Sequence, residues 1–195
     1  MAEPTKLNFK IYQGSTFTET FRWEGDFKIY APISNITKAA PMVVTSTAHG
    51  IPINWRVQIS NVTGMKEANT TDYINATSVT ANTVTFNDVN SVAYTAYTAG
   101  TGVLVYNQPV SLAGYTARMQ IREKITSATF IKELTTANGG IIIDDTNKVI
   151  TITISATDTA LFTFKTAIYS LELVSGSVVE PFIYGNISLE LDITR

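Results

Sequence analysis

The chain has 195 residues, 45 % of them hydrophobic and 15 % charged, with a net charge of −2. The charged fraction is below the roughly 25 % usual for soluble domains, and the lack of any basic run argues against a nucleic-acid partner, because phosphate binding needs a basic patch. The absence of cysteine excludes disulfides, thiolate metal sites and a cysteine nucleophile. Residues 1–10 lack the apolar core of a signal peptide, and no run of about 18 apolar residues predicts a membrane span. We therefore expect a protein made in the cytoplasm, with no membrane partner.

Short alternating segments separated by turn residues fill the chain, which predicts an all-β protein. One face of a first strand carries Leu7, Phe9 and Ile11. One face of a second carries Phe17, Phe21 and Trp23. Residues 13–15 are expected to form the turn between them, and residues 24–26, with their glycine, to end the second strand.

The middle of the chain has strand periodicity and turns of its own. Residues 36–105 form a series of short alternating segments, after which the earlier pattern resumes at Pro109. An insertion of this kind is tolerated where the host chain makes an exposed loop. We therefore expect an outer domain of residues 1–35 and 108–195, and an inserted module of residues 36–107.

The second half of the outer domain contains clear strand signals. Residues 116–122 alternate, with Ala117, Met119 and Ile121 inward, and residues 130–134 are a further candidate strand. Residues 139–154 predict a hairpin, followed by a short helix capped by Ser155. Strands at 168–174, 178–184 and 187–193 complete the set. This number of short strands favours an immunoglobulin-like β-sandwich, with a closed barrel as the alternative.

Several blocks of the insert occur in an order known from phage proteins. These blocks are residues 43–50, 57–59, 62–65 and 80–84, together with Asn69 and Tyr73. In this order the insert resembles the phage modules that are named after the first catalytic cysteine half-domain of ubiquitin-activating enzymes. Residues 54–56 (Asn-Trp-Arg) stand where such modules usually carry Gly-Asp. The resemblance implies a small β-barrel and not ubiquitin chemistry, for which this chain has no cysteine.

The outer domain carries a second resemblance. Its blocks are residues 13–17, 21–23, 112–122 and 168–173. Over about residues 7–30 and 108–195 the chain is similar to the sandwich domains of phage tail and baseplate proteins, including the N-terminal domain of baseplate upper proteins. Together the two resemblances imply a structural component of a phage particle.

Residues that could carry chemistry are few. His49 is the only histidine, and a general base needs a nucleophile or an orienting acid beside it, so we assign it no catalytic role. Residues 144–147 offer oxygen ligands for calcium, but Asp and Asn are also what a hairpin turn requires, and we interpret them as a turn. No cofactor or metal is predicted. Trp55, Tyr94 and Tyr97 are candidates for a contact surface, since aromatic side chains are enriched at interfaces.

From these observations we predict a non-enzymatic structural protein of a bacteriophage virion. It would be a tail connector, adaptor, baseplate-associated or tail-decorating protein, present in several copies and acting through contacts with other virion proteins. The alternatives are a capsid decoration protein and a module of the particle that binds a host-surface glycan. An enzyme such as a depolymerase would require a cleft lined by two facing carboxylates.

Overall fold

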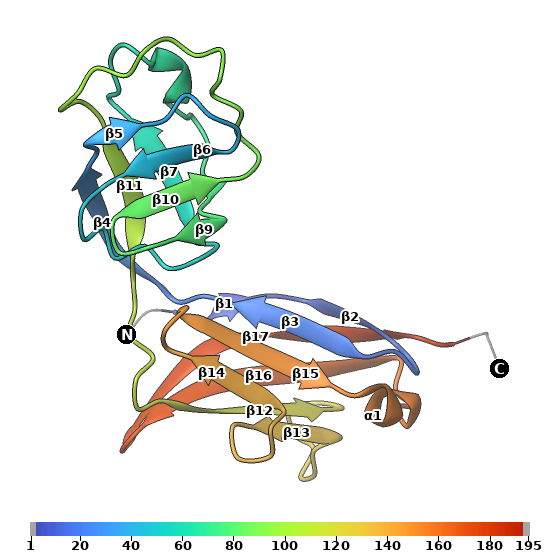
Figure 1. Cartoon of the computed structure of the whole chain (residues 1–195). Helices are drawn as coiled ribbons and strands as arrows, with labels where there is room; N and C mark the ends of the chain where they lie inside the picture. The colour runs from blue at the N-terminus through green and yellow to red at the C-terminus, as the bar shows by residue number, and fades with distance from the viewer. Residues whose placement is uncertain (1–2, 193–195) are drawn as a thin grey trace. The chain divides into compact units, whose positions relative to one another are not determined.

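A computed structural model describes residues 3–192 of the chain (Figure 1). Within this range the secondary structure is nearly all β, with one short α-helix, α1 (Ala156–Ala160), and one turn of 3-10 helix at Lys66–Ala68. The predicted all-β class is therefore confirmed. No helix within residues 3–192 is long and apolar enough to cross a membrane.

The chain divides into two compact units. Unit 1 comprises residues 1–22 and 111–195, and unit 2 comprises residues 23–110. The border expected after residue 35 differs from this division because of strand β4 (Glu24–Pro32), which pairs along its length with β11 (Val103–Pro109). Residues 24–26 therefore begin a strand instead of forming a turn.

The larger sheet of unit 1 has the order β1-β17-β16-β12-β13, and β2 also pairs with β17. Its strands are β1 (Thr5–Lys6), β2 (Phe9–Tyr12), β12 (Thr116–Arg122), β13 (Lys132–Thr135), β16 (Thr166–Ser175) and β17 (Val178–Glu190). Both β1 and β2 run parallel to β17, whereas the other pairings are antiparallel. The early and late segments of the chain thus share one sheet.

Strand β17 is continuous where the sequence predicted two strands. Its 13 residues include Gly185 and Asn186, which pair with β16 instead of forming a turn. Ile187 and Leu189 are buried, but Leu191 lies beyond the strand and is exposed. Ile193, the last residue of the predicted strand, lies outside the described residues.

The smaller sheet of unit 1 has the order β14-β15-β3. Its strands are β3 (Phe17–Phe21), β14 (Ile141–Asp144) and β15 (Val149–Ile154). The β14–β15 hairpin is confirmed, and Ile150, Ile152 and Ile154 are fully buried on one face. Ser155 caps α1 by accepting a hydrogen bond from the backbone N–H of Asp158, as its position predicted.

Aromatic rings join the two sheets of unit 1. The Phe9 ring on β2 lies 5.2 Å from Phe17 and 6.1 Å from Phe21, both on β3, and it stacks on Tyr169 of β16 at 4.6 Å. Aromatic pairs at these distances add to the stabilisation that comes from burial alone. Burial raises the pKa of Tyr169, whose hydroxyl donates to the carbonyl oxygen of Leu7 at 2.8 Å.

Unit 2 contains two four-stranded sheets, with the orders β5-β6-β10-β9 and β4-β11-β7-β8. The remaining strands are β5 (Asn35–Ile36), β6 (Met42–Thr45), β7 (Arg56–Ser60), β8 (Ile74–Asn75), β9 (Ser78–Val79) and β10 (Thr83–Phe86). Both sheets contribute to one buried cluster, which includes Met42, Val57, Phe86 and Leu104. Unit 2 therefore has a hydrophobic core of its own.

Candidate functional site

The three aromatic residues predicted to form a contact surface belong to the core of unit 2. Trp55 is fully buried, and its indole N–H donates to the backbone oxygen of Asn107 at 3.0 Å. Tyr94 and Tyr97 are half-buried and pack against the same core. The Tyr97 hydroxyl lies 2.8 Å from the Ile33 oxygen and 2.6 Å from the Thr101 oxygen. These three side chains therefore stabilise unit 2 and do not present an open aromatic face.

His49 has a structural role in unit 2. It is buried, and its Nδ1 accepts a hydrogen bond from the backbone N–H of Ile51 at 3.0 Å. Its Nε2 lies 3.2 Å from the Thr83 carbonyl oxygen, which can only accept, so we assign the proton to Nε2. Both ring nitrogens are thus occupied by backbone groups, which leaves neither for catalysis.

The acidic segment 144–147 forms the turn of the β14–β15 hairpin. Asp144 Oδ1 accepts from the backbone N–H groups of Thr146 (2.9 Å) and Asn147 (3.1 Å), and Oδ2 accepts from the Asn147 side chain at 2.7 Å. The Asn147 hydrogen bonds hold the pKa of Asp144 below its usual range. Asp145 instead accepts from Lys148 Nζ and from the backbone N–H of Leu112, both at 2.6 Å. Across residues 3–192 no group of three or more His, Cys, Asp or Glu side chains is arranged to hold a metal ion.

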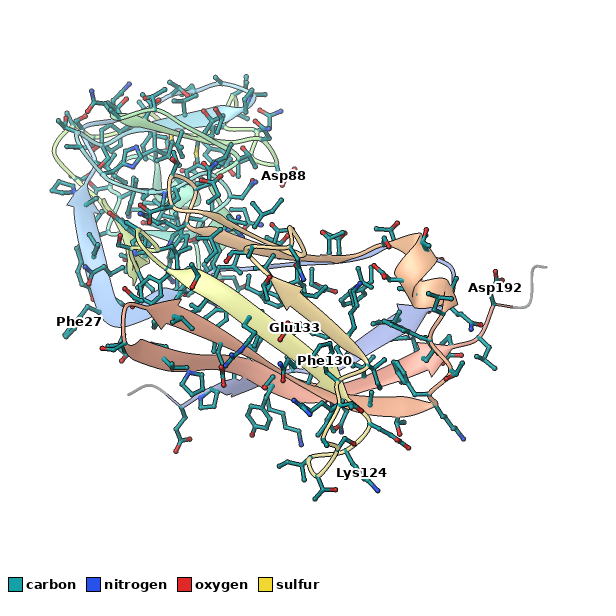
Figure 2. The ribbon with its side chains drawn as sticks, turned by 90° about the horizontal axis from the view of Figure 1, so that it is seen from below. Phe27, Asp88, Lys124, Phe130, Glu133 and Asp192 are labelled. Carbon is teal, nitrogen blue, oxygen red and sulfur yellow. The ribbon has the colours of Figure 1, made fainter. Side chains whose placement is uncertain are left out.

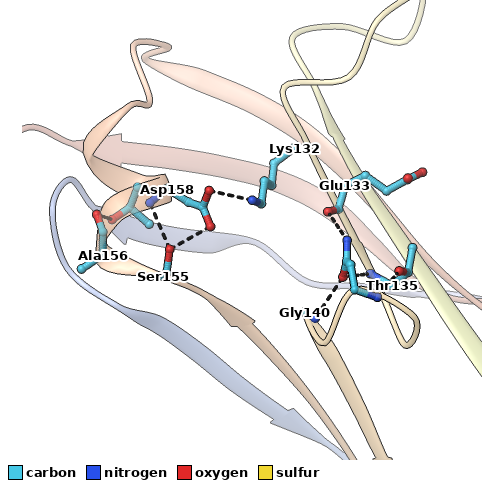
Figure 3. A network of polar contacts seen from close by, with 9 residues as sticks. Lys132, Glu133, Thr135, Gly140, Ser155, Ala156 and Asp158 are labelled. Carbon is cyan, nitrogen blue, oxygen red and sulfur yellow. Dashed lines mark hydrogen bonds and ion pairs between the residues drawn. The ribbon is translucent and has the colours of Figure 1, made fainter.

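A polar network next to α1 brings together a serine, an aspartate and a lysine (Figure 3). Lys132 Nζ lies 2.6 Å from Asp158 Oδ1, and the Ser155 hydroxyl donates to Asp158 Oδ2 at 2.8 Å. The ion pair with Lys132 is the main cause that lowers the pKa of Asp158. Because the ion pair with Lys132 and the lowered pKa make Asp158 a weak base, this arrangement does not activate the Ser155 hydroxyl as a nucleophile. Nearby, Asn138 Oδ1 accepts from the backbone N–H of Gly140 at 3.0 Å, so this network fixes the ends of strands and the helix.

Two aromatic side chains of unit 2 are exposed, and both lie on β4. Phe27 is 75 % exposed and Tyr30 is 62 % exposed. Figure 2 shows Phe27 directed outward from this strand. Strand β4 ends its sheet, with no second neighbour among the described strands, but it carries Lys28 and Pro32, which oppose the addition of another strand. A partner would therefore meet these rings through side-chain packing.

A pocket of about 440 Å³ lies in unit 1. It is lined by a row of side chains that the strand register brings together on the outer face of the larger sheet: Gln120 pairs with Ser170, Ser170 with Tyr184, and Tyr184 with Lys6. These residues alternate with buried neighbours such as Ile121, Leu171 and Ile183, which point into the core.

A second row and a loop complete the pocket. Arg122 pairs with Ile168, and Ile168 pairs with Asn186, while Ile125 comes from the loop that follows β12. Arg122 Nη1 donates to the Ser127 oxygen at 2.6 Å, which ties this loop to the sheet. Backbone register therefore brings the outward-facing side chains of the pocket together, and Arg122 holds the adjoining loop against them.

Sequence reasoning missed this pocket. Its residues come from four strands and a loop that are distant in the chain, and each alone reads as an ordinary solvent-facing strand residue. Two signals were available: the inward positions predicted for Ala117, Met119 and Ile121 leave Gln120 and Arg122 outward, and residues 168–174 were predicted as a strand. Without the strand order, the sequence could not bring them to Lys6.

Comparison with known protein families finds no family that matches this chain, and a search of curated proteins finds no matching sequence.

Proposed function

We propose that this protein is a non-enzymatic structural component of a bacteriophage virion that acts through protein–protein contacts. Within the particle we place it in the tail, as a connector, adaptor, baseplate-associated or decorating protein present in several copies. We interpret unit 1 as a discontinuous immunoglobulin-like β-sandwich and unit 2 as the inserted small β-barrel. The sequence blocks that resemble phage tail proteins and phage modules support the phage assignment.

The exposed rings on β4 are the main structural support for a contact role. Phe27 and Tyr30 are the two most exposed aromatic side chains within residues 3–192, and they present large apolar surfaces to solvent. Aromatic residues dominate the binding energy of many interfaces, and stable contacts bury on the order of 1,600 Å² in total. A neighbouring virion protein that covers β4 would remove these rings from water.

The proposal is tested in particles of the phage whose genome encodes this chain. Labelling purified particles with an antibody against the chain, followed by electron microscopy, should mark the tail. Label on the head would instead indicate a capsid decoration protein, and particles without label would refute the virion assignment.

A double substitution tests the contact surface itself. Phe27→Ser with Tyr30→Ser should reduce the amount of the protein in purified particles at least tenfold, on the order of the effect of losing one strong interface residue. Val92→Ser, which changes another exposed apolar residue of unit 2, is the matched control and should leave incorporation unchanged. Equal incorporation of the unchanged protein, the double variant and the Val92→Ser control would exclude β4 as the contact surface.

A further inference from the structure

The pocket on the larger sheet of unit 1 has an unusual balance of charge for this chain. The protein carries 14 Lys and Arg against 16 Asp and Glu. Yet two of the described lining residues, Lys6 and Arg122, are cationic, and none is acidic. Cationic side chains that line a concave site raise the local concentration of anionic ligands.

The arginine of the pocket is held in place before any ligand arrives. Arg122 Nη2 donates to Gln120 Oε1 at 2.8 Å, and Gln120 Nε2 in turn donates to Glu133 Oε1 at 2.6 Å. With the bond from Nη1 to Ser127, Arg122 uses two of the five N–H donors that a guanidinium carries. The remaining donors are available to a ligand, and fixing the side chain in advance lowers the entropy cost of binding.

Four other lining residues have side-chain groups suited to a hydroxylated ligand. Within residues 3–192, the Lys6 ammonium, the Ser170 and Tyr184 hydroxyls and the Asn186 amide have no side-chain hydrogen-bond partner. Between them they supply both donors and acceptors, as sugar hydroxyls require. The Tyr184 ring, with Ile125 and Ile168, offers apolar surface for the carbon face of a sugar ring.

We infer that this pocket binds a sugar that carries a carboxylate, such as a uronic or nonulosonic acid. Lys6 would take the carboxylate in a charge-assisted hydrogen bond. Arg122 lies three strands away on β12, and with Ser170 and Asn186 it would take ring hydroxyls. The volume of about 440 Å³ falls in the range of small-ligand pockets and fits one or two sugar rings. This inference is independent of the proposed function, because a virion protein need not bind sugar and a sugar-binding protein need not belong to a virion.

An acidic peptide is the competing ligand, and the structure favours it less. Extended peptides are usually recognised by backbone pairing at an open sheet edge. Here the site lies on a sheet face and spans β12, β16, β17 and β1, so a ligand meets side chains and not an open ladder of backbone groups. A compact ligand rich in hydroxyls matches those side chains better than an extended chain does.

Titration of the purified full-length protein by calorimetry tests the inference. Methyl glucuronide and methyl glucoside differ only in a carboxylate at one carbon, and the glucuronide should bind at least about tenfold more tightly, as expected for one charge-assisted hydrogen bond. Its affinity should fall with added salt. N-acetylneuraminic acid and a tri-glutamate peptide complete the panel.

Three variants connect binding to the pocket. Lys6→Gln should weaken binding of the acidic sugar about tenfold, and Ser170→Trp should abolish it by filling the pocket; both residues are exposed, so the fold should be retained. Lys28→Gln, an equal charge change on exposed β4, is the matched control and should bind as the unchanged protein does. Melting curves of each variant confirm folding.

The inference is overturned if glucoside and glucuronide bind equally, or if the peptide binds in their place with the same dependence on Lys6. It is also overturned if no acidic sugar in the panel gives saturable binding, or if Lys28→Gln weakens binding as much as Lys6→Gln.

Discussion

Unit 1 and unit 2 are both built from strands, but different interactions hold them together. In unit 1, β12, β16 and β17 have 7, 10 and 13 residues and pair side by side, so long ladders satisfy most backbone groups. Unit 2 has one comparable pair, β4 and β11 with 9 and 7 residues, but its β5, β8 and β9 have two residues each. Buried backbone groups must be paired, so a unit with such short ladders needs other partners.

Polar side chains supply those partners in unit 2. Asn69 forms a pair of hydrogen bonds with the backbone of Val62, accepting at 2.9 Å and donating at 3.0 Å. Thr70 Oγ1 accepts from the backbone N–H of Ile59 at 3.0 Å. In unit 1, by contrast, Thr18 on β3 is exposed on the surface of a sheet. The abundant Thr, Ser and Asn thus replace missing strand pairing in unit 2, whereas in unit 1 they bond at the ends of elements, as Ser155 and Asn138 do, and also cover exposed sheet surface.

Removing the end of strand β17 should cause the largest loss of stability. Truncation after Asn186 deletes buried Ile187 and Leu189 and the pairing of β17 with β2. Each buried aliphatic residue contributes about 2–5 kcal/mol, against a total stability of about 5–15 kcal/mol for a typical domain. Unit 1 should unfold while unit 2 stays folded. Hydrogen exchange measured by mass spectrometry distinguishes the units, and protected amides throughout unit 1 would contradict this expectation.

A core substitution in unit 2 should destabilise unit 2 and leave unit 1 unchanged. Trp55→Ala removes a fully buried side chain and its bond to Asn107, and should destabilise unit 2 by about 3–5 kcal/mol. Exchange should rise in residues 23–110 and stay unchanged in unit 1. Trp23 remains as a fluorescent reporter of the urea transition. A change of less than about 1 kcal/mol would show that Trp55 is not a core residue.

Loss of a buried hydroxyl of unit 2 should cost more stability than loss of an exposed hydroxyl of unit 1. Ser91 Oγ is buried, accepts from the Ala39 N–H at 3.1 Å and lies 2.6 Å from the Thr37 oxygen. Ser91→Ala should cost about 1–3 kcal/mol, because it leaves buried backbone groups without partners. Thr18→Ala, at an exposed hydroxyl of unit 1, should change the free energy of unfolding in urea by less than about 0.5 kcal/mol. Similar losses in both variants would remove the proposed difference between the units.

Lowering the pH should destabilise mainly unit 1, and this change in stability should be the smallest of the four predicted here. Hydrogen bonds and ion pairs lower the pKa of Asp144, Asp145 and Asp158 in unit 1, whereas only Glu67 is lowered in unit 2. A lowered pKa in the folded state stabilises the fold above the unfolded pKa, and this contribution is lost as pH falls through the folded value. The free energy of unfolding of unit 1, measured in urea, should therefore fall as the pH drops below the usual carboxyl range. Asp158→Asn should reduce that dependence and cost less than about 1 kcal/mol at neutral pH, since the pair is partly exposed.

Local alternation predicted much of unit 1 correctly. The inward positions Ala117, Met119 and Ile121, the β14–β15 hairpin and the cap at Ser155 all follow from patterns a few residues long. Strand β4 was missed because residues 24–26 have turn composition, and only pairing with the distant β11 makes them a strand. The continuity of β17 through Gly185 has the same cause, since β16 pairs across it.

The candidate sites were harder to predict than the strands. A tryptophan in a short strand fits a core and an interface equally well, and the sequence alone could not show that Trp55 faces the core of unit 2. The turn at 144–147 could be predicted because Asp144 bonds to residues two and three positions further on. His49 bonds to Ile51, two residues on, but also to Thr83, which no local pattern indicates. The pocket beside Tyr184 depends on the register of four strands, which no local pattern contains.

The parallel pairing of β1 and β2 with β17 constrains the order in which the two units can fold during translation. Phe9 is synthesised before the whole of unit 2, yet its strand partner Ile187 is synthesised after it. Unit 2 is one continuous stretch, so its core can close while the remainder is still being translated. Until β17 is synthesised, the apolar side chains of β1 and β2 have no sheet partner, so they would be accessible to a chaperone that binds nascent chains.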